Sequence, residues 1–369
     1  MSVKLDNFVD VKIVKRAAAP SPAVFDTAVF VSSEESGAPY NCYVTITGGT
    51  GGPTNRGTKA NPYSLTDTFA GTSTFGSDSF IKCFFDNGGK YLHVISGLAY
   101  NSTDKLWYIN TTTTELPQNE IVIFSDSTLT PTIVEGPDQK IFLCSITATT
   151  IPAGTSGSGI VYNYRPANVE YNGFGIAAIA AYYTKINISN SSTIKDYAFT
   201  AQKELHAGAI VTNNTDAATC IANHINCTVY LAGANRNIGG DDSTGEDITN
   251  LFMRIALQQT LTNRLLNVLV TKLPLNQIGI NMIQAAVCAE LNIYVNNGYI
   301  DTSKIWVEDD LYIDGELVAA QGNSLPGGYA IHIAPITAAN YTNHQAPEIY
   351  ILYGDIVGIR KIVITGEAF

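Results

Sequence analysis

Apolar and polar residues alternate at both ends of the chain. Near the start, Val9, Val11 and Ile13 alternate with polar neighbours in the stretch DVKIVK. The last stretch alternates almost to the terminus, in three short sets made of Ile349, Ile351 and Tyr353, then Val357 and Ile359, then Ile362 and Ile364. A period of two predicts β-strands that turn one face toward a core. Both ends of the chain are therefore predicted to be strands.

Short segments interrupt these terminal strands. After the first strand, the run Ala17–Pro22 contains Pro20 and Pro22, and proline continues neither a helix nor a strand ladder. Near the other end, Gly354 and Gly358 mark a turn or bulge. The chain is therefore expected to change direction at both places.

Between residues 23 and 200, apolar runs predict strands that alternate with helices. The predicted strands are AVFDTAVFVS (23–32), YVTIT (43–47), KYLHVI (90–95), LWYIN (106–110), EIVIFS (120–125), KIFLCSIT (140–147) and GIVYNY (159–164). Helices are expected after Ser64, near Ser77–Phe85, and in VEYNGFGIAAIAAYY (169–183). Within residues 105–200, the alternation of strands and helix-like stretches is typical of an α/β unit.

The strongest helical pattern lies between residues 247 and 295. Asp247 stands where an N-cap belongs, Pro274 interrupts the pattern, and Asn276 can cap a second helix. Apolar residues follow mostly at three- and four-residue spacing, first Leu251, Phe252, Ile255, Leu261, Leu265, Val268 and Leu269, then Ile280, Ile283, Val287, Leu291 and Tyr294. Asn297-Gly298 is expected to end the second helix.

Composition narrows the class of protein. Of 369 residues, 45% are hydrophobic, which indicates a globular chain, and only 14% are charged, which suits a surface packed against partners. The net charge is −11 and no run of Lys or Arg occurs, so direct nucleic acid contact and binding to an anionic membrane surface are not expected. The start of the chain shows no signal-peptide pattern and no segment approaches 18 apolar residues, so we expect assembly in a cytosol-like compartment without membrane insertion.

The sequence offers no motif for catalysis, a cofactor or a metal. GPTNRGTK (52–59) nearly matches a P-loop, but Thr58 occupies the lysine position and Pro53 removes an N–H group from the phosphate cradle. Cys220, His224 and Cys227 supply three zinc ligands where a structural site needs four. The six cysteines, Cys42, Cys83, Cys144, Cys220, Cys227 and Cys288, are predicted to be reduced core residues.

The acidic loop DDSTGED (241–247) lacks the ligand spacing of an EF-hand. Solvated acids and helix capping by Asp247 explain it, and a weak cation site stays open. We therefore predict no catalytic, cofactor-binding or metal-binding residues and no enzyme activity.

Five segments, in their order along the chain, resemble the contractile tail sheath proteins of myophage-type bacteriophages. They are FVDVKIVKRAAAPSPAVFDTAVFVS (8–32), YSLTDTFAGTSTFGSDSFIKCFFDNGGKYLHVI (63–95), IVYNY with GIAAIAAYYTK (160–185), the helical pair of 249–300 with its K-x-P-x-x-x-x-G-I link and N-G-x-I exit, and ANYTNHQAPEIYILYGDIVGIRKIVITGEAF (339–369). The match is collinear over most of the chain. The chain is short for this family, which implies that a large outer insertion domain is missing or reduced.

The resemblance implies a multi-domain α+β or mixed α/β fold whose terminal strands are exchanged between subunits. The implied parts are an N-terminal arm (1–20), a discontinuous core domain (21–95 and 205–355), an inserted α/β domain (96–204) and a C-terminal strand extension (356–369). Strand exchange is assigned to Val9, Val11, Ile13, Ile359, Ile362 and Ile364, and hinges to Pro20, Pro22, Gly354 and Gly358. By analogy with the family, Asn340, Asn343, His344 and Gln345 are expected to face the tail tube.

The implied function is structural. Subunits would assemble helically with copies of themselves as hexameric rings around a tail tube, contact baseplate and tail terminator proteins, and contract to drive the tube through a host envelope. The location would be the tail of a virion assembled in the host cytoplasm. Two alternatives stay open: another phage tail protein of the tube or baseplate, and an enzyme with a Rossmann-like nucleotide pocket around 43–60 or 90–200.

Overall fold

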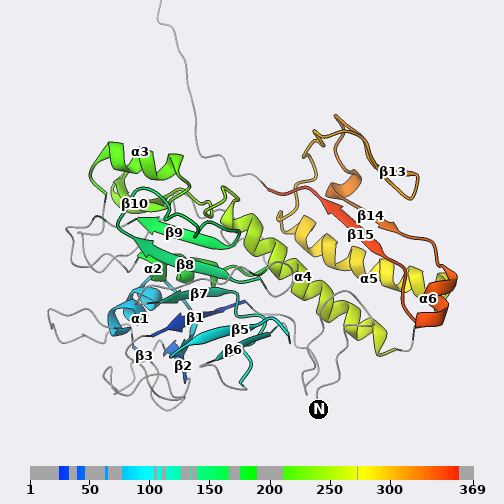
Figure 1. The fold of residues 1–369 in the computed structure, drawn as a ribbon, viewed down its shortest axis with the longest axis horizontal. Helices are drawn as coiled ribbons and strands as arrows, with labels where there is room; N and C mark the ends of the chain where they lie inside the picture. The colour runs from blue at the N-terminus through cyan, green and yellow to red at the C-terminus, as the bar shows by residue number, and fades with distance from the viewer. Residues whose placement is uncertain are drawn as a thin grey trace, which may run out of the picture. The chain divides into compact units, whose positions relative to one another are not determined.

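The fold was analysed in a computed structural model, which describes residues 25–32, 40–45, 63–64, 77–103, 106–109, 114–125, 134, 139–164, 166, 175–188, 211–271 and 273–356. These residues divide into two compact units (Figure 1). The larger one, here called the sheet unit, holds the described residues between 25 and 187 and from 211 to 263. The smaller one, here called the hairpin unit, holds Ile188 and the described residues from 264 to 356.

A mixed sheet of seven strands organises the sheet unit, in the order β3-β2-β4-β1-β7-β8-β9. Its strands are β1 (Thr27–Val31), β2 (Tyr40–Thr45), β3 (Tyr63–Ser64), β4 (Tyr91–Ile95), β7 (Val122–Ser125), β8 (Ile141–Ile146) and β9 (Ile160–Tyr164). The five strands from β4 to β9 run parallel, and β2 is antiparallel to β4. Parallel strands are buried on both faces, which explains continuous apolar runs such as IFLCSI in β8.

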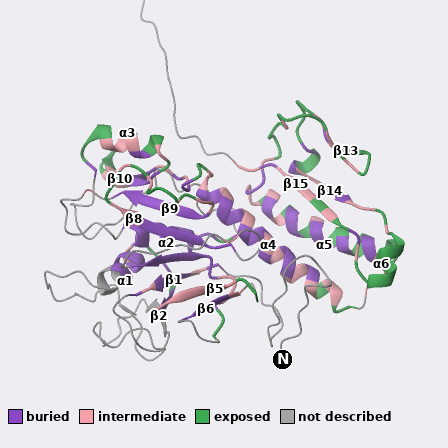
Figure 2. Ribbon diagram, in the orientation of Figure 1, coloured by how far each residue is buried: buried purple, intermediate pink, exposed green. Residues whose placement is uncertain are grey.

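Helices α1 (Ser77–Asp86) and α2 (Gly175–Tyr183) pack on each other on one face of this sheet, and α2 also packs on β7 and β8. Every residue of α2 is buried, and its small alanines allow a close approach to the strands (Figure 2). Phe30 of β1 stacks on Phe80 of α1 and on Phe124 of β7, with ring centroids 5.9 and 5.0 Å away. The start of α4 (Ile248–Leu269) packs on the same face, where the ring centroids of Phe252 and Tyr183 lie 5.4 Å apart.

The opposite face carries a second apolar cluster. It joins alternate residues of the central strands, such as Ile123 and Phe142, with Trp107, Cys220 and Cys227. These come from a hairpin of β5 (Leu98–Asn101) and β6 (Leu106–Ile109), from α3 (Asn214–Ala222), and from a hairpin of β10 (Cys227–Leu231) and β11 (Ala234–Ile238). The sheet is therefore covered on both faces.

Helix α4 crosses the boundary between the units, which falls between Asn263 and Arg264. In the hairpin unit its last part is followed by α5 (Gln277–Asn296), capped by Asn276, whose side chain accepts hydrogen bonds from the N–H groups of Ile278 and Gly279. The carbonyl of Pro274 lies so close to Gly279 that a Cβ there would come within 1.9 Å of the oxygen. The Pro and Gly of the K-x-P-x-x-x-x-G-I link thus fit together at the start of α5.

By length and composition α5 could cross a membrane, a property that it shares with core helices of many proteins. Its side chains distinguish a membrane-spanning helix from one that packs against protein. Ile283, Val287 and Leu291 form a buried stripe, and Glu290, also buried, accepts a hydrogen bond of 2.6 Å from Arg264 of α4. A buried stripe with a paired carboxylate is expected of a helix that packs against protein.

Two hairpins and a short helix complete the hairpin unit. They are formed by β12 (Leu311–Ile313) with β13 (Glu316–Ala319), by β14 (Tyr329–Ile333) with β15 (Ile349–Tyr353), and by α6 (Ala338–Asn343), with a 3₁₀ turn at η5 (Pro326–Gly328). Each hairpin is antiparallel and forms a sheet of two strands in the part of the chain that the structure describes. β13 and α6 are largely exposed (Figure 2).

The predicted mixed α/β class is confirmed, as are the strands at β1, β4 and β6–β9 and the helices at α1, α2, α4 and α5. Ser64, expected to cap a helix, is the second residue of β3, and the residues that follow it lie outside the described ones. β7, β8 and β9 extend the sheet of β1 and β4, and the boundary between the two compact units lies inside α4. The expected division into an arm, a core domain, an inserted domain and a C-terminal extension stays a prediction.

The contact between Pro274 and Gly279 gives a stability prediction. Gly279→Ala should destabilise the protein by about 2 kcal/mol or more, because the new methyl group forces the Pro274 carbonyl away from the helix start. Thermal unfolding followed by circular dichroism would measure the change. Gln284→Ala, at an exposed position of the same helix, is the control and should change stability by under about 0.5 kcal/mol. Equal melting temperatures for the two variants would contradict the close packing.

Candidate functional site

The described residues contain no group of three or more His, Cys, Asp or Glu side chains arranged to hold a metal ion. Of the three ligands considered in the sequence, Cys220 and Cys227 are buried free thiols. His224 turns to Asp241 instead, with its Nδ1 atom 3.5 Å from the carboxylate. The P-loop-like segment 52–59 lies outside the described residues.

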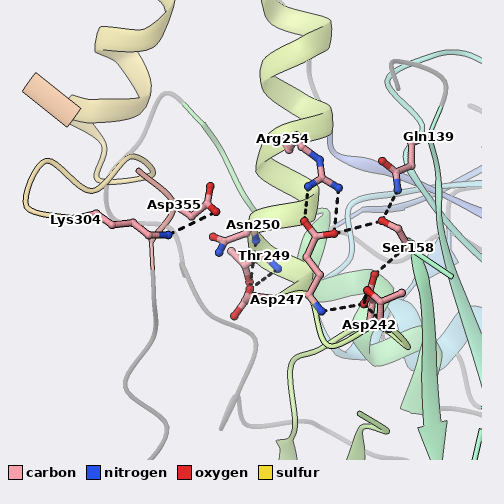
Figure 3. A network of polar contacts seen from close by, with 12 residues as sticks. Gln139, Ser158, Asp242, Asp247, Thr249, Asn250, Arg254, Lys304 and Asp355 are labelled. Atoms are coloured by element: carbon pink, nitrogen blue, oxygen red, sulfur yellow. Dashed lines mark hydrogen bonds and ion pairs between the residues drawn. The ribbon is translucent and has the colours of Figure 1, made fainter. Parts of the chain in front are cut away.

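The most connected polar site is the acidic loop 241–247 (Figure 3). Asp242 at its centre is fully buried, and its carboxylate accepts four hydrogen bonds. The donors are the N–H groups of Gly159, Thr244 and Glu246, at 2.9, 2.8 and 3.1 Å, and the hydroxyl of Thr244, at 2.7 Å. The interpretation as a loop of solvated acids is therefore wrong for Asp242, whose charge is held by the chain itself.

The neighbouring acids of the loop act on helix α4 and on the loop before β9. Asp247 caps α4, as predicted, by accepting a 2.8 Å hydrogen bond from the Thr249 N–H group. Glu246 binds both terminal nitrogens of Arg254 in α4 and accepts a 3.3 Å hydrogen bond from Ser158 (Figure 3). Each carboxylate of the loop thus has a partner in the chain, and the loop works as a structural joint between β9 and α4.

A second candidate region, which is exposed, is α6 with the turn after it. Its predicted tube-facing residues differ in what they do. Asn340 is half-buried and belongs to the helix itself, because its side chain accepts hydrogen bonds from the N–H and hydroxyl groups of Thr337 at 2.7 Å each, in a capping box. Asn343, His344 and Gln345 are exposed, and His344 ends the helix in the left-handed conformation, with φ of +52°. From Pro335 to Pro347 this protrusion carries no Asp, Glu, Lys or Arg.

The β12–β13 hairpin was not predicted from the sequence. Turn residues Asp314 and Gly315 have positive φ, and an Asp-Gly pair between alternating strands is the usual signal for such a hairpin. His332 of β14, 8% exposed, lies between two carboxylates of this hairpin, 3.0 Å from Asp314 and 3.2 Å from Glu316. These contacts hold the β12–β13 turn against β14.

The hairpin unit also leaves apolar side chains exposed. Tyr312 and Leu317 are partners across the β12–β13 ladder and are 58% and 48% exposed. Val307, in the preceding segment, is 78% exposed. In the described residues, β14 and β15 pair with each other as an antiparallel sheet of two strands. Exposed apolar residues are a feature of a surface that binds other protein.

Of the predicted hinge residues, only Gly354 is described. Its N–H group donates to the carbonyl of Gly328 at 3.0 Å, and its own carbonyl accepts from Asp301 at 2.9 Å. A Cβ at this position would come within 2.5 Å of the Asp301 carbonyl oxygen. Pro20, Pro22, Gly358 and all six residues assigned to strand exchange lie outside the described residues, so these assignments stay predictions.

The fold resembles those of solved contractile injection systems. A chain of the contracted sheath complex of an extracellular contractile injection system (PVC) matches with a TM-score of 0.62 and 12% identity, over 97% of this chain and 96% of that one. A chain of the contracted helical sheath of the anti-feeding prophage (AFP) matches with a TM-score of 0.59 and 12% identity, over 97% and 98%. A chain of the AFP baseplate matches with a TM-score of 0.58 and 13% identity, over 98% and 99%.

Comparison with protein-family models and with curated proteins gives no match. At the identities above, the likeness is one of fold, and it extends over almost the whole length of both chains. The expected resemblance to sheath proteins is therefore confirmed in three dimensions.

The buried Asp242 carboxylate gives a second stability prediction. Asp242→Asn should lower the stability of the sheet unit by about 2–4 kcal/mol, because the amide group replaces one acceptor oxygen by a donor that faces N–H groups. Thermal unfolding measures it. Asp241→Asn is the matched control in the same loop, where the side chain is 24% exposed, and should cost under about 1 kcal/mol. A tolerated Asp242→Asn would mean that the carboxylate is not the centre of the joint.

Proposed function

We propose that this protein is the structural subunit of a contractile sheath, which polymerises helically around an inner tube and contracts to drive that tube through a cell envelope. The observation that carries the proposal is the fold match to the PVC sheath chain, which covers 97% of this chain and 96% of that one. A shared fold alone does not fix a function. Here the likeness extends over almost the whole of both chains, and two of the three matched chains belong to sheath assemblies.

The proposed assembly works by exchange of terminal strands between subunits. The hairpin β14–β15 is compatible with this, because a small antiparallel sheet can be extended by an added strand through main-chain hydrogen bonds. The segments around Val9, Val11 and Ile13 and around Ile359, Ile362 and Ile364 have the alternation that such a strand needs. In the proposal each adds to the sheet of a neighbouring subunit.

Charge favours the same arrangement. From residue 305 to residue 356 the chain has no Lys or Arg, but it has the acids Glu308, Asp309, Asp310, Asp314, Glu316, Glu348 and Asp355. The first 16 residues carry Lys4, Lys12, Lys15 and Arg16 against Asp6 and Asp10. A basic arm is attracted to an acidic surface and is repelled by another basic arm. Charge therefore favours binding of the arm of one subunit to the hairpin unit of a neighbour.

The remaining assignments follow from this arrangement. The segments with Pro20 and Pro22 and with Gly354 and Gly358 would be hinges that let subunits rotate while the exchanged strands stay paired. Of these, Gly354 lies between two backbone segments and would act as the fixed end of its hinge. Asn343, His344 and Gln345 present an uncharged exposed surface for the tube, with Asn340 supporting the helix from within.

The partners would be other copies of the chain in hexameric rings, the tube protein, and the baseplate and terminator proteins at the two ends of the tail. The particle would be assembled in the cytoplasm of the host and released as part of a tail. No nucleotide is needed, because the driving energy would be stored in the packing of the extended state. The subunit would then have no enzyme activity and no cofactor.

A baseplate role is the second candidate. The matched chain of the AFP baseplate aligns over 98% of this chain and 99% of that one. A subunit of this fold could therefore form a ring at the baseplate instead of a long sheath. Particle length separates the two roles, because a sheath subunit polymerises into tubes and a baseplate subunit stops at rings.

The test is electron microscopy of the purified full chain over a range of concentrations. We expect tubes, or stacks of rings, with a helical repeat. Short closed rings alone would favour the baseplate role. A monomer at every concentration and ionic strength would overturn the proposal.

Strand exchange is tested by changing the apolar side of the N-terminal strand. The triple variant Val9→Ser, Val11→Ser, Ile13→Ser should keep its circular dichroism spectrum and melting temperature but lose tube formation, because the added strand no longer buries its apolar face. The double variant Asp10→Asn, Lys12→Gln changes the polar side and is the control, which should still assemble. Normal tubes from the triple variant would refute the exchange, and an unfolded triple variant would place the strand in its own subunit.

A further inference from the structure

Two thiols of the sheet unit lie in contact inside one apolar cluster. Cys220 belongs to α3 and Cys227 is the first residue of β10, and both are fully buried with Ile225 and Ile238. Their side chains hydrogen-bond to each other. Both are free cysteines in the described structure. Neither has a part in the proposed assembly.

The backbone between the two cysteines folds back on itself. The Ile225 N–H group donates to the Cys220 carbonyl at 2.9 Å, and His224 has a φ of +55°. Such a tight reversal brings the end of α3 next to the start of β10. The pair is thus close in sequence and in space, which is the arrangement that a disulfide requires.

The two cysteines differ in how firmly they are held. Asn226, the residue before Cys227, donates from its side chain to the Tyr162 and Asp241 carbonyls at 3.1 and 2.9 Å and accepts from the Gly240 N–H group at 2.6 Å. Cys227 is therefore fixed to the central sheet. By contrast, Cys220 is the only buried residue of the nine-residue helix α3.

A short helix held by one buried side chain, the partly buried Ala217 and a hydrogen bond from its C-cap Asn223 to Thr149 opens at lower free-energy cost than a central strand. Opening of α3 exposes Cys220 to solvent while Cys227 stays in place. The hydrogen bond from the Cys227 thiol lowers the pKa of Cys220, and the hydrogen bond to Cys220 together with burial raises the pKa of Cys227. Cys220 is thus both the thiol that becomes accessible and the one that ionises first.

We propose that Cys220 and Cys227 form an oxidation site, at which a low-molecular-weight disulfide converts the two thiols into a disulfide that staples α3 to β10. The Cys220 thiolate attacks one sulfur of the small disulfide, forms a mixed disulfide and releases one thiolate. The Cys227 thiolate then attacks the Cys220 sulfur and releases the second. The protein loses two protons and two electrons, and the small disulfide is reduced to two thiols.

Formation of the disulfide would make the sheet unit more stable. In a reducing compartment the thiols stay free and α3 can open. After transfer to an oxidising medium the bond closes, and α3 is held to the sheet unit by a covalent link. A disulfide stabilises chiefly by restricting the unfolded chain, so oxidation should raise the melting temperature of the sheet unit by about 5 °C.

The experiment uses the full chain, incubated natively with oxidised or with reduced glutathione, then unfolded and alkylated with iodoacetamide without reductant. Trypsin cuts after Lys203 and Arg236, and no Lys or Arg lies between them, so both cysteines fall in the single peptide 204–236. Mass spectrometry should find this peptide lighter by two hydrogen atoms and unalkylated in the oxidised sample. In the reduced sample it should carry two alkyl groups.

Variants make the result specific. Cys220→Ser and Cys227→Ser should each abolish both the mass change and the rise in melting temperature. Cys144→Ser should keep both effects. Cys144 lies in the same cluster, but it is held on central strand β8, where burial raises its pKa to about 12. Two alkylated thiols after native oxidation, or a lasting glutathione adduct in place of the closed bond, would overturn the proposal.

Discussion

A buried carboxylate holds the start of the longest helix to the central sheet. Removing Asp242 from water costs several kcal/mol, and the cost is offset only because four donors converge on its two oxygens. One of those donors, the N–H group of Gly159, lies directly before β9. The position of α4 relative to the sheet therefore depends on this joint, and the neighbouring pair of Glu246 and Arg254 extends it along the helix. Because α4 runs without a break into the hairpin unit, a structural feature of the sheet unit fixes the first turns of a helix that serves both.

The sequence predicted the features that depend on near neighbours. Asp247 and Asn276 cap helices because a cap acts within three residues, and the sequence of residues 169–183 predicted the helix that the structure has at α2. It could not predict that Asp242 is buried, because its partner Gly159 lies 83 residues away. The boundary between the two units, inside α4, could not be predicted either. An unbroken amphipathic helix has no local sequence feature that marks where one hydrophobic core ends and the next begins. The β12–β13 hairpin, by contrast, does have a local sequence signal, the turn pair Asp314-Gly315, although it was not predicted.

The two units differ in how far their acidic side chains are paired within the chain. In the sheet unit the acids of loop 241–247 are matched by partners within the chain. The hairpin unit leaves acids and apolar side chains exposed, such as Glu316, Tyr312 and Leu317. A sheet of two strands has little stability of its own in water. Strands added to β14–β15 would therefore stabilise the hairpin unit.

The scarcity of charge bears on how such an assembly would hold together. With 14% charged residues and a net charge of −11, copies of this chain repel one another at long range and have few opposite charges to pair. Attraction must then come from buried apolar area and from main-chain hydrogen bonds, neither of which is screened by salt in the way that surface ion pairs are. The basic arm and the acidic hairpin unit are the exception, and their attraction would act mainly on the approach of subunits. Once strands are paired, the contact would depend on backbone geometry, which a rotation of whole subunits can preserve.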